Sequence, residues 1–501
     1  MAATAIPCVI HNKHFPTPTT FDVVDPADRK TVLHAVSAFT ANSVDELVKS
    51  SRQGFAVWRD TPFAERRKIF FRVQQLFNER MGELIQCEAK ETTAGAGFAG
   101  YEVGVLTAAS LEESLASMST ALRGDMAPLD PSGKRMCVVR EPIGPTLSMV
   151  PWNAPSTLCM RAIINPLAAG CSVILKTSEF SPKTQSFIAQ MFLDAGLPEG
   201  VLNVIHVSTQ DSPHVIKAII EHEGVRKVNF TGSTRVGRII AQICAANLKP
   251  VVLELGGKAP VIVTEDADIQ LAANNIIFGG LMNQGQICMS SASVLVHKNV
   301  KQELAKALSA ILQQNQALLQ AGAQPNSPMS PDVKDHRLRG LFTTASANRA
   351  KEVYDDAIKA GAKPVAGQAG FDASLGLVQP VFLEATTSMR LYSEEIFAPI
   401  LGMYEFSTDE EAIKMANEPG AGLSASIFSK NETKAWQIAR GIESGAVHIN
   451  GMTVHDDQSV PHGGVKTSGI GRFNGVEGIR EYTYQKTITI TPGIQYPFFA
   501  L

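Results

Sequence analysis

The spacing of apolar residues divides the chain into stretches with different expected structures. The first 23 residues contain three prolines, which interrupt regular helices, so we expect an extended arm there. From Ser43 to about Leu122 the apolar residues recur at helical spacing, with turn residues near Pro62 and Gly95. We expect these apolar residues to form the core contacts of a helical region.

Beyond this region, short β-rich segments alternate with helical ones. The expected strands cover 146–150, 172–176, 201–207, 227–231 and 251–255, and the expected helices cover 155–169, 181–195, 215–220 and 235–246. Such alternation indicates parallel crossovers and a doubly wound α/β sheet. Ligands bind beyond the carboxyl ends of the strands in these sheets. The loops after Val150, Leu175, Phe230 and Leu253 are therefore candidate binding loops.

Composition narrows the class of protein. The chain has 501 residues, 45% of them hydrophobic and 19% charged, which is typical of a globular protein with two or three domains. A net charge of −3 offers no basic field for nucleic acid or an anionic membrane. We find no apolar run of a bilayer's length and no signal-peptide pattern. Seven scattered cysteines indicate reduced thiols, so we expect a cytoplasmic protein.

The candidate binding loops carry polar residues. Trp152 and Asn153 follow the first strand, and the second strand leads into the segment from Lys176 to Glu179. Gly232 and Ser233 open a helix, where backbone N–H groups and a hydroxyl can receive a phosphate. The glycines of that loop alternatively let the helix pack close to the strand, and this loop alone does not decide between the two interpretations.

A carboxylate and a thiol stand out further along the chain. Glu254 ends an apolar strand and begins the sequence Glu-Leu-Gly-Gly-Lys, and Cys288 follows 34 residues later. A buried carboxylate is costly unless it has a function. A thiol attacks carbonyl carbons, and a carboxylate activates water to release the product. We interpret the other six cysteines as inert residues of the arm, helices and strands.

Several motifs in order resemble the NAD(P)-dependent aldehyde dehydrogenase superfamily, from about residue 20 to 490. They are Pro-Trp-Asn at 151–153, Lys-Thr-Ser-Glu at 176–179, Phe-Thr-Gly-Ser-Thr at 230–234, Glu-Leu-Gly-Gly-Lys at 254–258, Gly-Gln-Ile-Cys at 285–288, Glu-Glu-Ile-Phe-Ala-Pro at 394–399 and Gly-Gly-Val-Lys-Thr-Ser-Gly at 463–469. The resemblance implies a doubly wound Rossmann-like NAD-binding domain, a second α/β catalytic domain and a small β oligomerisation element.

The resemblance also implies boundaries and roles. The NAD-binding domain takes residues 1–123 and 143–256, the catalytic domain 257–455, and oligomerisation segments lie in 124–142 and 456–501. Cys288 is then the nucleophile, Glu254 the base that activates water, and the Asn153 amide an oxyanion donor beside the Cys288 N–H. The residues implied for the cofactor are Trp152, Lys176, Glu179, Gly232, Ser233, Leu255, Glu395 and Phe397. No histidine has metal-ligand spacing, so we expect no metal.

Cofactor and substrate can be narrowed further. A carboxylate at Glu179 accepts from ribose hydroxyls and repels a 2′-phosphate, so we expect NAD, with NADP as a weaker cofactor. The sequences at 283–290 and 450–456 look most like the salicylaldehyde, benzaldehyde and vanillin dehydrogenase branch. An apolar channel suits a flat ring; its expected lining residues are Tyr101, Leu106, Trp152, Met160, Ile287 and Met452. Arg161 either faces this channel or belongs to a structural ion pair.

Other interpretations remain open at this stage. An aliphatic or semialdehyde dehydrogenase shares the fold, a CoA-acylating relative needs no base such as Glu254, and a crystallin-like relative is non-catalytic. Asn153 alternatively caps the next helix. For Lys258 we expect structural hydrogen bonds, and for His455-Asp456-Asp457 only loop polarity.

Three residues depart from the family pattern, and the assembly is left partly open. The departures are Ser293, Ala398 and His462, which stand where arginine, glycine and phenylalanine are common.

Segments 136–141 and 482–490 alternate like exposed strands, and exposed strand edges pair readily with another subunit. We therefore expect a homodimer or homotetramer.

Overall fold

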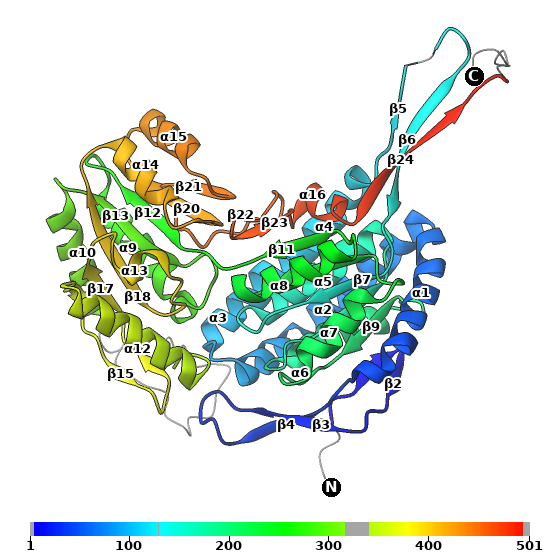
Figure 1. The fold of residues 1–501 in the computed structure, drawn as a ribbon, viewed down its shortest axis with the longest axis horizontal. Coiled ribbons are helices and arrows are strands. Elements are labelled where there is room, and N and C mark those ends of the chain that lie inside the picture. Colours follow the sequence, from blue (N-terminus) through cyan, green and yellow to red (C-terminus); the bar gives the residue numbers. More distant parts are fainter. Residues whose placement is uncertain (1–4, 129, 316–339, 494–501) are drawn as a thin grey trace.

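The computed structural model describes residues 5–128, 130–315 and 340–493 of the chain. Two large sheets, each flanked by helices, form the two halves of the molecule, and a ribbon of strands projects from one half (Figure 1). Within the described residues no helix is long and apolar enough to cross a membrane.

The first half is built on an eight-stranded sheet. Its strands, in spatial order, are β2 (Lys13–Phe15), β1 (Cys8–Ile10), β9 (Leu202–Ile205), β8 (Val173–Lys176), β7 (Thr146–Met149), β10 (Lys227–Thr231), β11 (Val251–Glu254) and β23 (Gly469–Ile470). The strands from β9 to β11 are parallel. Within this parallel part the chain passes through β7, β8 and β9 and then crosses to β10 and β11 on the other side of β7. The doubly wound α/β fold predicted from the sequence is thus confirmed.

Helices cover both faces of this sheet, which is why its strands read as continuous apolar runs. They are α1 (Val44–Asp60), α2 (Phe63–Glu91), α3 (Ala96–Tyr101), α4 (Ala108–Ala121), α5 (Pro155–Ala169), α6 (Pro182–Asp194), α7 (Ser212–Glu221), α8 (Thr234–Ala246) and α16 (Gly475–Arg480). Val173 and Leu175 point into the core beneath α2, α4, α5 and α6, whereas Ile174 points into the core beneath α1, α7 and α8. A π-helical turn, Glu102–Thr107, joins α3 to α4.

The second half contains a seven-stranded sheet. Its order is β14 (Lys363–Gly367), β17 (Val381–Glu384), β18 (Ile400–Phe406), β13 (Ser291–His297), β12 (Ala259–Val263), β20 (Ser424–Phe428) and β21 (Ala446–Ile449). All neighbouring pairs except β14–β17 are parallel. Its helices are α9 (Ile269–Leu281), α10 (Lys301–Gln314), α12 (Thr344–Lys359), α13 (Arg390–Ser393), α14 (Asp409–Asn417) and α15 (Glu432–Gly441).

The projecting ribbon joins two segments that are far apart in the sequence. In it β24 (Thr483–Ile490) pairs with β6 (Arg135–Pro142), which also pairs with β5 (Asp125–Met126). This confirms the predicted strands at 136–141 and 482–490. Met126, Tyr484, Ile488 and Ile490 lie exposed on the ribbon.

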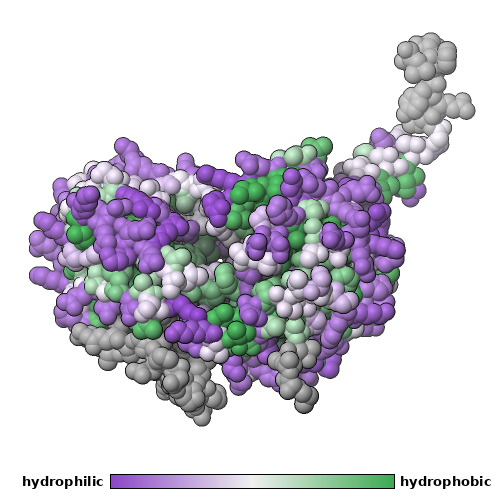
Figure 2. Space-filling model, turned by 60° about the horizontal axis from the view of Figure 1, so that its bottom comes forward, coloured by the Kyte–Doolittle hydropathy of each residue, from purple (hydrophilic) through white to green (hydrophobic). Residues whose placement is uncertain are grey.

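Small two-stranded sheets complete the fold. They are β3 (Thr20–Val24) with β4 (Val32–Ser37), β15 (Phe371–Asp372) with β16 (Leu377–Val378), and β19 (Ala421–Gly422) with β22 (Val465–Lys466). The predicted extended arm contains β1, β2 and the start of β3, and residues 1–4 lie outside the described part. Seen from below, hydrophilic residues cover most of the surface, and apolar ones gather near its middle (Figure 2).

The two sheets meet where β11 ends. Glu254 is the last residue of β11, and β12 of the other sheet begins at Ala259, so residues 254–258 link the two halves. The chain returns to this point at Gly469, which pairs with Glu254 in the antiparallel contact between β23 and β11. Side chains from distant segments therefore meet at this junction.

Candidate active site

Cys288 lies on a tightly held loop after α9. Asn283, Gln284 and Gly285 have φ values of 46°, 59° and 73°, three consecutive residues in the left-handed region. For non-glycine residues this conformation is costly and persists where surrounding contacts hold it. Here the Asn283 amide donates to the Asn153 carbonyl at 2.9 Å, and the Gln284 amide donates to the Thr93 carbonyl at 3.3 Å. The first half of the molecule thus fixes the loop that carries the thiol.

The loop brings the thiol of Cys288 to the carboxylate of Glu254. Sγ lies 3.4 Å from Oε1, at the junction of the two sheets. Burial, with the negative charges of Glu254 and Glu395, raises the pKa of the Cys288 thiol well above its usual range. Ile287 and Met452, two of the six residues expected to line a substrate channel, belong to the same apolar cluster as Cys288.

The other thiols stand in different surroundings. Cys8, Cys87, Cys159, Cys171 and Cys244 are buried, and burial raises their pKa values. Cys137 lies on β6 of the ribbon. Of the seven thiols, the one beside an ionised carboxylate at the sheet junction is that of Cys288.

Two glycines make this close approach possible. A Cβ at Gly257 would lie 2.4 Å from the carbonyl oxygen of Cys288, and a Cβ at Gly256 would lie 2.1 Å from the carboxylate of Glu395. Both distances are far shorter than any contact a side chain tolerates. The Gly-Gly pair after Glu254 therefore allows the loop that carries Cys288, and the side chain of Glu395, to pack against this backbone.

Asn153 points toward the same loop. Its side-chain amide donates to the carbonyl of Gln286 at 3.0 Å, and the residue is buried. The N-cap position of α5 is Ala154, and Pro155 begins the helix. The alternative prediction that the Asn153 side chain caps this helix is therefore wrong, and its amide is available to the thiol loop.

Glu254 is also part of a largely buried cluster of two carboxylates and two basic side chains. Arg161 of α5 donates to Glu254 Oε2, and its other terminal nitrogen lies 3.5 Å from Asp456. His462 Nε2 lies 3.2 Å from Glu254 Oε1, and His462 Nδ1 lies 3.6 Å from Asp456. Arg161 thus belongs to a structural ion pair, the second of the two predicted alternatives.

The interpretation of Asp456 as mere loop polarity is wrong. Its carboxylate is drawn into the site by Arg161 and His462, and Asn474 donates to it at 2.5 Å. One sequence feature hinted at this contact: His462 is a basic residue in a position that is usually aromatic. The sequence did not show which residues His462 contacts, because they lie on separate parts of the chain.

The cluster fixes the protonation of its members. Burial by itself raises the pKa of Glu254, but the charge of Arg161 and the hydrogen bond from His462 outweigh it and lower the value to about 2. Burial by itself lowers the pKa of His462, but Asp456 and Glu254 outweigh it and raise the value above its usual range. Glu254 is therefore a carboxylate at neutral pH.

The residues predicted for a cofactor lie at the carboxyl ends of the strands. Lys176 at the end of β8 pairs with Glu179 at 2.9 Å, and this charge lowers the pKa of Glu179 although burial opposes it. Ser233 caps α8 by accepting from the N–H of Val236 at 3.4 Å. Gly237 packs so closely against Leu255 that a Cβ there would lie 2.4 Å from its side chain. Close packing in the loop at 231–237 is thus present alongside a helix N-terminus that Ser233 caps.

The remaining predicted cofactor residues face one another across the junction. Glu395 accepts from the N–H of Gly257 at 3.1 Å. Trp152 stacks on Phe342 with ring centroids 4.2 Å apart and meets Phe397 edge-on at 6.2 Å. Phe397 has φ of 59°, a strained value for a bulky residue. Phe342 was not singled out in the sequence, because nothing in its local pattern distinguishes it from a core residue.

Other predictions differ from the structure. We expected hydrogen bonds for Lys258, but its buried ammonium has no partner among the described residues, and burial lowers its pKa to about 8. Ser293 lies in β13, and its hydroxyl likewise has no partner within the described ranges. Met160 belongs to the core beneath α2 and α5, and Trp152 to the aromatic group with Phe342 and Phe397. These two residues thus have contacts other than the predicted substrate channel.

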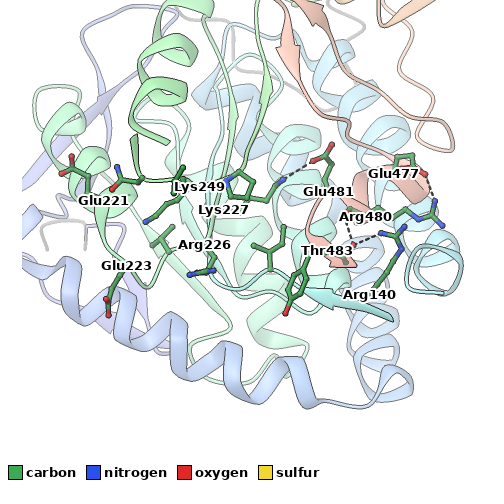
Figure 3. Close-up of a pocket in the computed structure, with 16 residues that line it drawn as sticks. Arg140, Glu221, Glu223, Arg226, Lys227, Lys249, Glu477, Arg480, Glu481 and Thr483 are labelled. Atoms are coloured by element: carbon green, nitrogen blue, oxygen red, sulfur yellow. Dashed lines mark hydrogen bonds and ion pairs between the residues drawn. The ribbon is translucent and has the colours of Figure 1, made fainter. Parts of the chain in front are cut away.

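A large pocket away from Cys288 and Glu254 is lined by many charged residues. It measures 990 Å³, lies at the base of the ribbon and contains none of the residues predicted for catalysis or cofactor binding. Four of its charged side chains form two ion pairs, Lys227–Glu481 and Arg480–Glu477 (Figure 3). In the part of the chain that the structure describes, no group of three or more His, Cys, Asp or Glu side chains is arranged to hold a metal ion.

Comparisons with known proteins agree with this geometry. Residues 15–488 match the model of the aldehyde dehydrogenase family. Vanillin dehydrogenase of Pseudomonas sp. (strain HR199 / DSM 7063) is 41% identical over 463 residues, 92% of each chain. The structure of salicylaldehyde dehydrogenase from Pseudomonas putida G7 with salicylaldehyde superposes with a TM-score of 0.91 at 34% identity, covering 99% of this chain and 100% of that one. PnpE in complex with nicotinamide adenine dinucleotide superposes with a TM-score of 0.90 at 30% identity, covering 99% and 100%.

Proposed function

Because this chain belongs to the aldehyde dehydrogenase family, we propose that it oxidises an aromatic aldehyde to the carboxylic acid, with NAD as the hydride acceptor. The observation that carries this proposal is the 3.4 Å contact between the Cys288 thiol and the Glu254 carboxylate. A nucleophile and a base at this distance suit acyl transfer to water.

The first half of the reaction is assigned to Cys288 and Asn153. The thiolate of Cys288 attacks the aldehyde carbon and forms a thiohemiacetal whose oxygen becomes negative. That charge needs preorganised donors. The Asn153 amide, held against the nucleophile loop at Gln286, is one donor, and the backbone N–H of Cys288 is the other. When bound, the dinucleotide accepts the hydride, which leaves a thioester on Cys288.

The second half is assigned to Glu254. Its carboxylate lies beside the sulfur, where a water molecule that attacks the thioester needs a proton acceptor. The low pKa of Glu254 keeps it ionised at neutral pH. A base in this position supports hydrolysis rather than transfer to coenzyme A. Omission of coenzyme A from the assay tests this point: turnover without it is expected, and strict dependence on it would contradict the proposal.

The cofactor is assigned to the carboxyl ends of the first sheet. The N-terminus of α8 with Ser233 suits a pyrophosphate. Gly256 leaves room for the Glu395 carboxylate, which we assign to the nicotinamide ribose, with Phe397 against the ring. We assign Lys176 and Glu179 to the adenosine ribose, and Trp152, Gly232 and Leu255 to the surrounding wall. On this basis the first sheet is the NAD-binding domain and the second is the catalytic domain, with the boundaries given above.

Cofactor choice follows from Glu179. Its ionised carboxylate repels a 2′-phosphate, which favours NAD over NADP. Steady-state kinetics with both dinucleotides are expected to give a higher kcat/KM with NAD. Glu179→Gln is expected to narrow that difference by loss of the charge. A wild-type enzyme that is more efficient with NADP would contradict the assignment.

The aromatic substrate class rests on the relatives and on the apolar residues beside the nucleophile. Vanillin and salicylaldehyde dehydrogenases are both among the similar proteins. Ile287 and Met452 pack beside Cys288, as a flat ring requires. An NADH-release panel of vanillin, salicylaldehyde, benzaldehyde, hexanal and betaine aldehyde is expected to favour the aromatic members by kcat/KM. Preference for hexanal or betaine aldehyde would contradict the assignment.

We propose in addition that the ribbon joins subunits into a homodimer or homotetramer. Its exposed Met126, Ile488 and Ile490 support this, because exposed apolar strands favour pairing with another chain. Sedimentation of the wild type and of Ile488→Lys tests it: a lighter species is expected for the variant, and a monomeric wild type would contradict it.

Seven free thiols support a reducing, cytoplasmic location, which fractionation of the native host tests.

A further inference from the structure

Glu254, Arg161, Asp456 and His462 form a closed ring in which two carboxylates alternate with two basic side chains. Arg161 contacts Glu254 and Asp456, and His462 contacts the same two carboxylates. Arg161 and His462 are exposed by only 2% and 4% at their side chains. The partners come from α5, β11 and two parts of the C-terminal segment, so the ring is a product of the fold rather than of neighbouring residues.

The two oxygens of Glu254 have different partners. Oε2 accepts from Arg161, whose guanidinium stays protonated at any working pH. Oε1 faces both the Cys288 sulfur at 3.4 Å and the His462 imidazole at 3.2 Å. The oxygen that would meet an attacking water is therefore the one that contacts the imidazole.

This arrangement raises a difficulty for Glu254 as the sole base. A carboxylate paired with arginine holds a proton weakly, so a proton taken from water has to move onward for the step to proceed. Arg161 has no free site for it. His462 Nε2 lies at the correct oxygen of Glu254, and in the neutral tautomer that keeps its proton on Nδ1, toward Asp456, Nε2 accepts a proton.

We propose that His462 is a positioning residue that receives, through Glu254, the proton released in thioester hydrolysis, and that Asp456 holds the imidazole for this purpose. The inference rests on the proposed function. To that function the inference adds a path for the proton, which passes from Glu254 Oε1 to His462 Nε2 over 3.2 Å. Asp456, 3.6 Å from Nδ1 on the other side of the ring, stabilises the protonated imidazole.

The step balances without a further reactant. The water oxygen bonds to the thioester carbon, and one water proton passes to Glu254 and on to His462. The carbon–sulfur bond then breaks, the acid leaves and Cys288 remains as the thiolate that begins the next cycle. His462 becomes an imidazolium between Glu254 and Asp456, and it returns to neutral by releasing the proton to solvent.

Several features hold the imidazole in place. The backbone of His462 forms two hydrogen bonds with Phe473, from N to O at 3.2 Å and from the Phe473 N to the His462 O at 2.7 Å. The Phe473 ring in turn supports the Arg161 guanidinium, 4.4 Å from its centroid. These contacts fix the orientation of the His462 ring, as a proton relay requires.

The groups that face His462 determine the pH at which it can accept. Glu254 of β11 and Asp456 of the C-terminal segment favour its protonated form, and Arg161 of α5 opposes it. His448 at the end of β21 also interacts with His462. The balance raises the pKa of His462 above its usual value, so the neutral, accepting form is lost as the pH falls through that raised value.

A rapid-mixing experiment separates this proposal from the proposed function. NADH forms before hydrolysis, so slow hydrolysis appears as a burst of NADH followed by slow turnover. The enzymes compared are the wild type, His462→Gln, Asp456→Asn and the control His455→Gln, which changes an exposed histidine of the same segment. Salicylaldehyde and NAD are the substrates, and the full pH profile of kcat is recorded for each.

For His462→Gln we expect a burst at the wild-type rate and a steady rate lowered about 10-fold, less than the roughly 100-fold minimum typical of a direct proton-transfer group. The acidic limb of its kcat profile should disappear. Asp456→Asn should shift that limb to lower pH, because the lost charge lowers the pKa of His462. His455→Gln should match the wild type.

The contradicting outcomes are distinct. A His462→Gln enzyme with wild-type kcat and pH profile would overturn the relay and leave the proposed function standing. A wild-type enzyme that makes no NADH from any aldehyde would overturn the proposed function itself. If His462→Gln fails to fold by circular dichroism, Asp456→Asn decides, and an unshifted acidic limb in that variant overturns the relay.

Discussion

The Sγ of Cys288 lies 3.4 Å from Oε1 of Glu254, although Glu254 ends β11 of the first sheet and Cys288 lies on the loop between α9 and β13 of the other half. The contact exists because β11 ends at Glu254, and because Gly257 lets the carbonyl of Cys288 approach the linking backbone. The carboxylate stays ionised beside Arg161, and its charge in turn disfavours the thiolate. The contact that we propose as the source of a base for hydrolysis therefore also makes the resting thiol hard to ionise.

This relationship predicts how the thiol titrates. Glu254→Gln removes the negative charge beside Cys288, so the pKa of the thiol should fall. At about pH 8, iodoacetamide should alkylate Cys288 about 10-fold faster, the change expected for one pKa unit. The measurement uses a Cys137→Ser background, which removes the other partly exposed thiol. An unchanged or slower alkylation rate would show that the carboxylate does not control the thiol.

Asn153 should act on formation of the thiohemiacetal. Asn153→Ala removes an oxyanion donor, so the rate of the NADH burst should fall about 100- to 1000-fold, as for other donors of this kind. Asn275→Ala is the control, since that amide bonds only the preceding turn of its own helix at Leu271. A burst rate within a few-fold of the wild type would remove Asn153 from the mechanism.

Gly257 should not tolerate a larger residue, because a side chain there has no room. Gly257→Ala places a Cβ 2.4 Å from the Cys288 carbonyl, so the nucleophile loop has to shift. We expect loss of most activity and about 1–3 kcal/mol of unfolding free energy, the usual cost of overpacking. Gly82→Ala on α2, where a Cβ meets nothing within 4 Å, should instead stabilise the protein by about 1 kcal/mol. Full activity of Gly257→Ala would contradict the packing described here.

A pair of buried carboxyl groups should make stability depend on pH. Glu102 accepts from the N–H groups of Ser156 and Thr157, both at 2.9 Å, and Ser156 Oγ donates to Glu88 at 2.5 Å. These bonds anchor the start of α5. Burial raises the pKa of Glu102 to about 7, and burial with the charge of Glu102 raises that of Glu88 well above its usual range.

The sign of the effect follows from linkage. Raised carboxyl pKa values mean that the folded state binds more protons than the unfolded state, so the free energy of unfolding falls as pH rises from about 4.5 toward 7. Glu88→Gln removes one of the two acids. Relative to the wild type, its melting temperature should therefore be higher near pH 8 than near pH 5. Glu83→Gln on the exposed side of α2 is the control, and an equal difference at both pH values would contradict the coupling.

Local sequence predicted the first sheet well, since strands buried on both faces read as continuous apolar runs between helices. Val173, Ile174 and Leu175 show this pattern, with side chains divided between two cores. The strands of the second sheet were implied only by the family resemblance. Motifs identified Cys288 and Glu254, but their contact depends on the left-handed run from Asn283 to Gly285, which long-range hydrogen bonds hold in place.

Asp456 shows what the sequence does not contain. A carboxylate between His455 and Asp457 reads as a solvated loop, and its burial follows from Arg161 on α5 and His462 six residues later. Lys258 shows the converse. Its place in Gly-Gly-Lys, without the rest of a P-loop, suggested structural hydrogen bonds, whereas tertiary packing buries the ammonium without a partner among the described residues.

The central claim is that Cys288 carries the substrate as a thioester that Glu254 releases. Its most direct test is the mass of Glu254→Gln after mixing with salicylaldehyde and NAD. We predict about one NADH per subunit and one acyl group, mapped by peptide digestion to Cys288, with no adduct on Cys288→Ala and no NADH from it. An acyl group on another residue, or NADH formation by Cys288→Ala, would contradict the account.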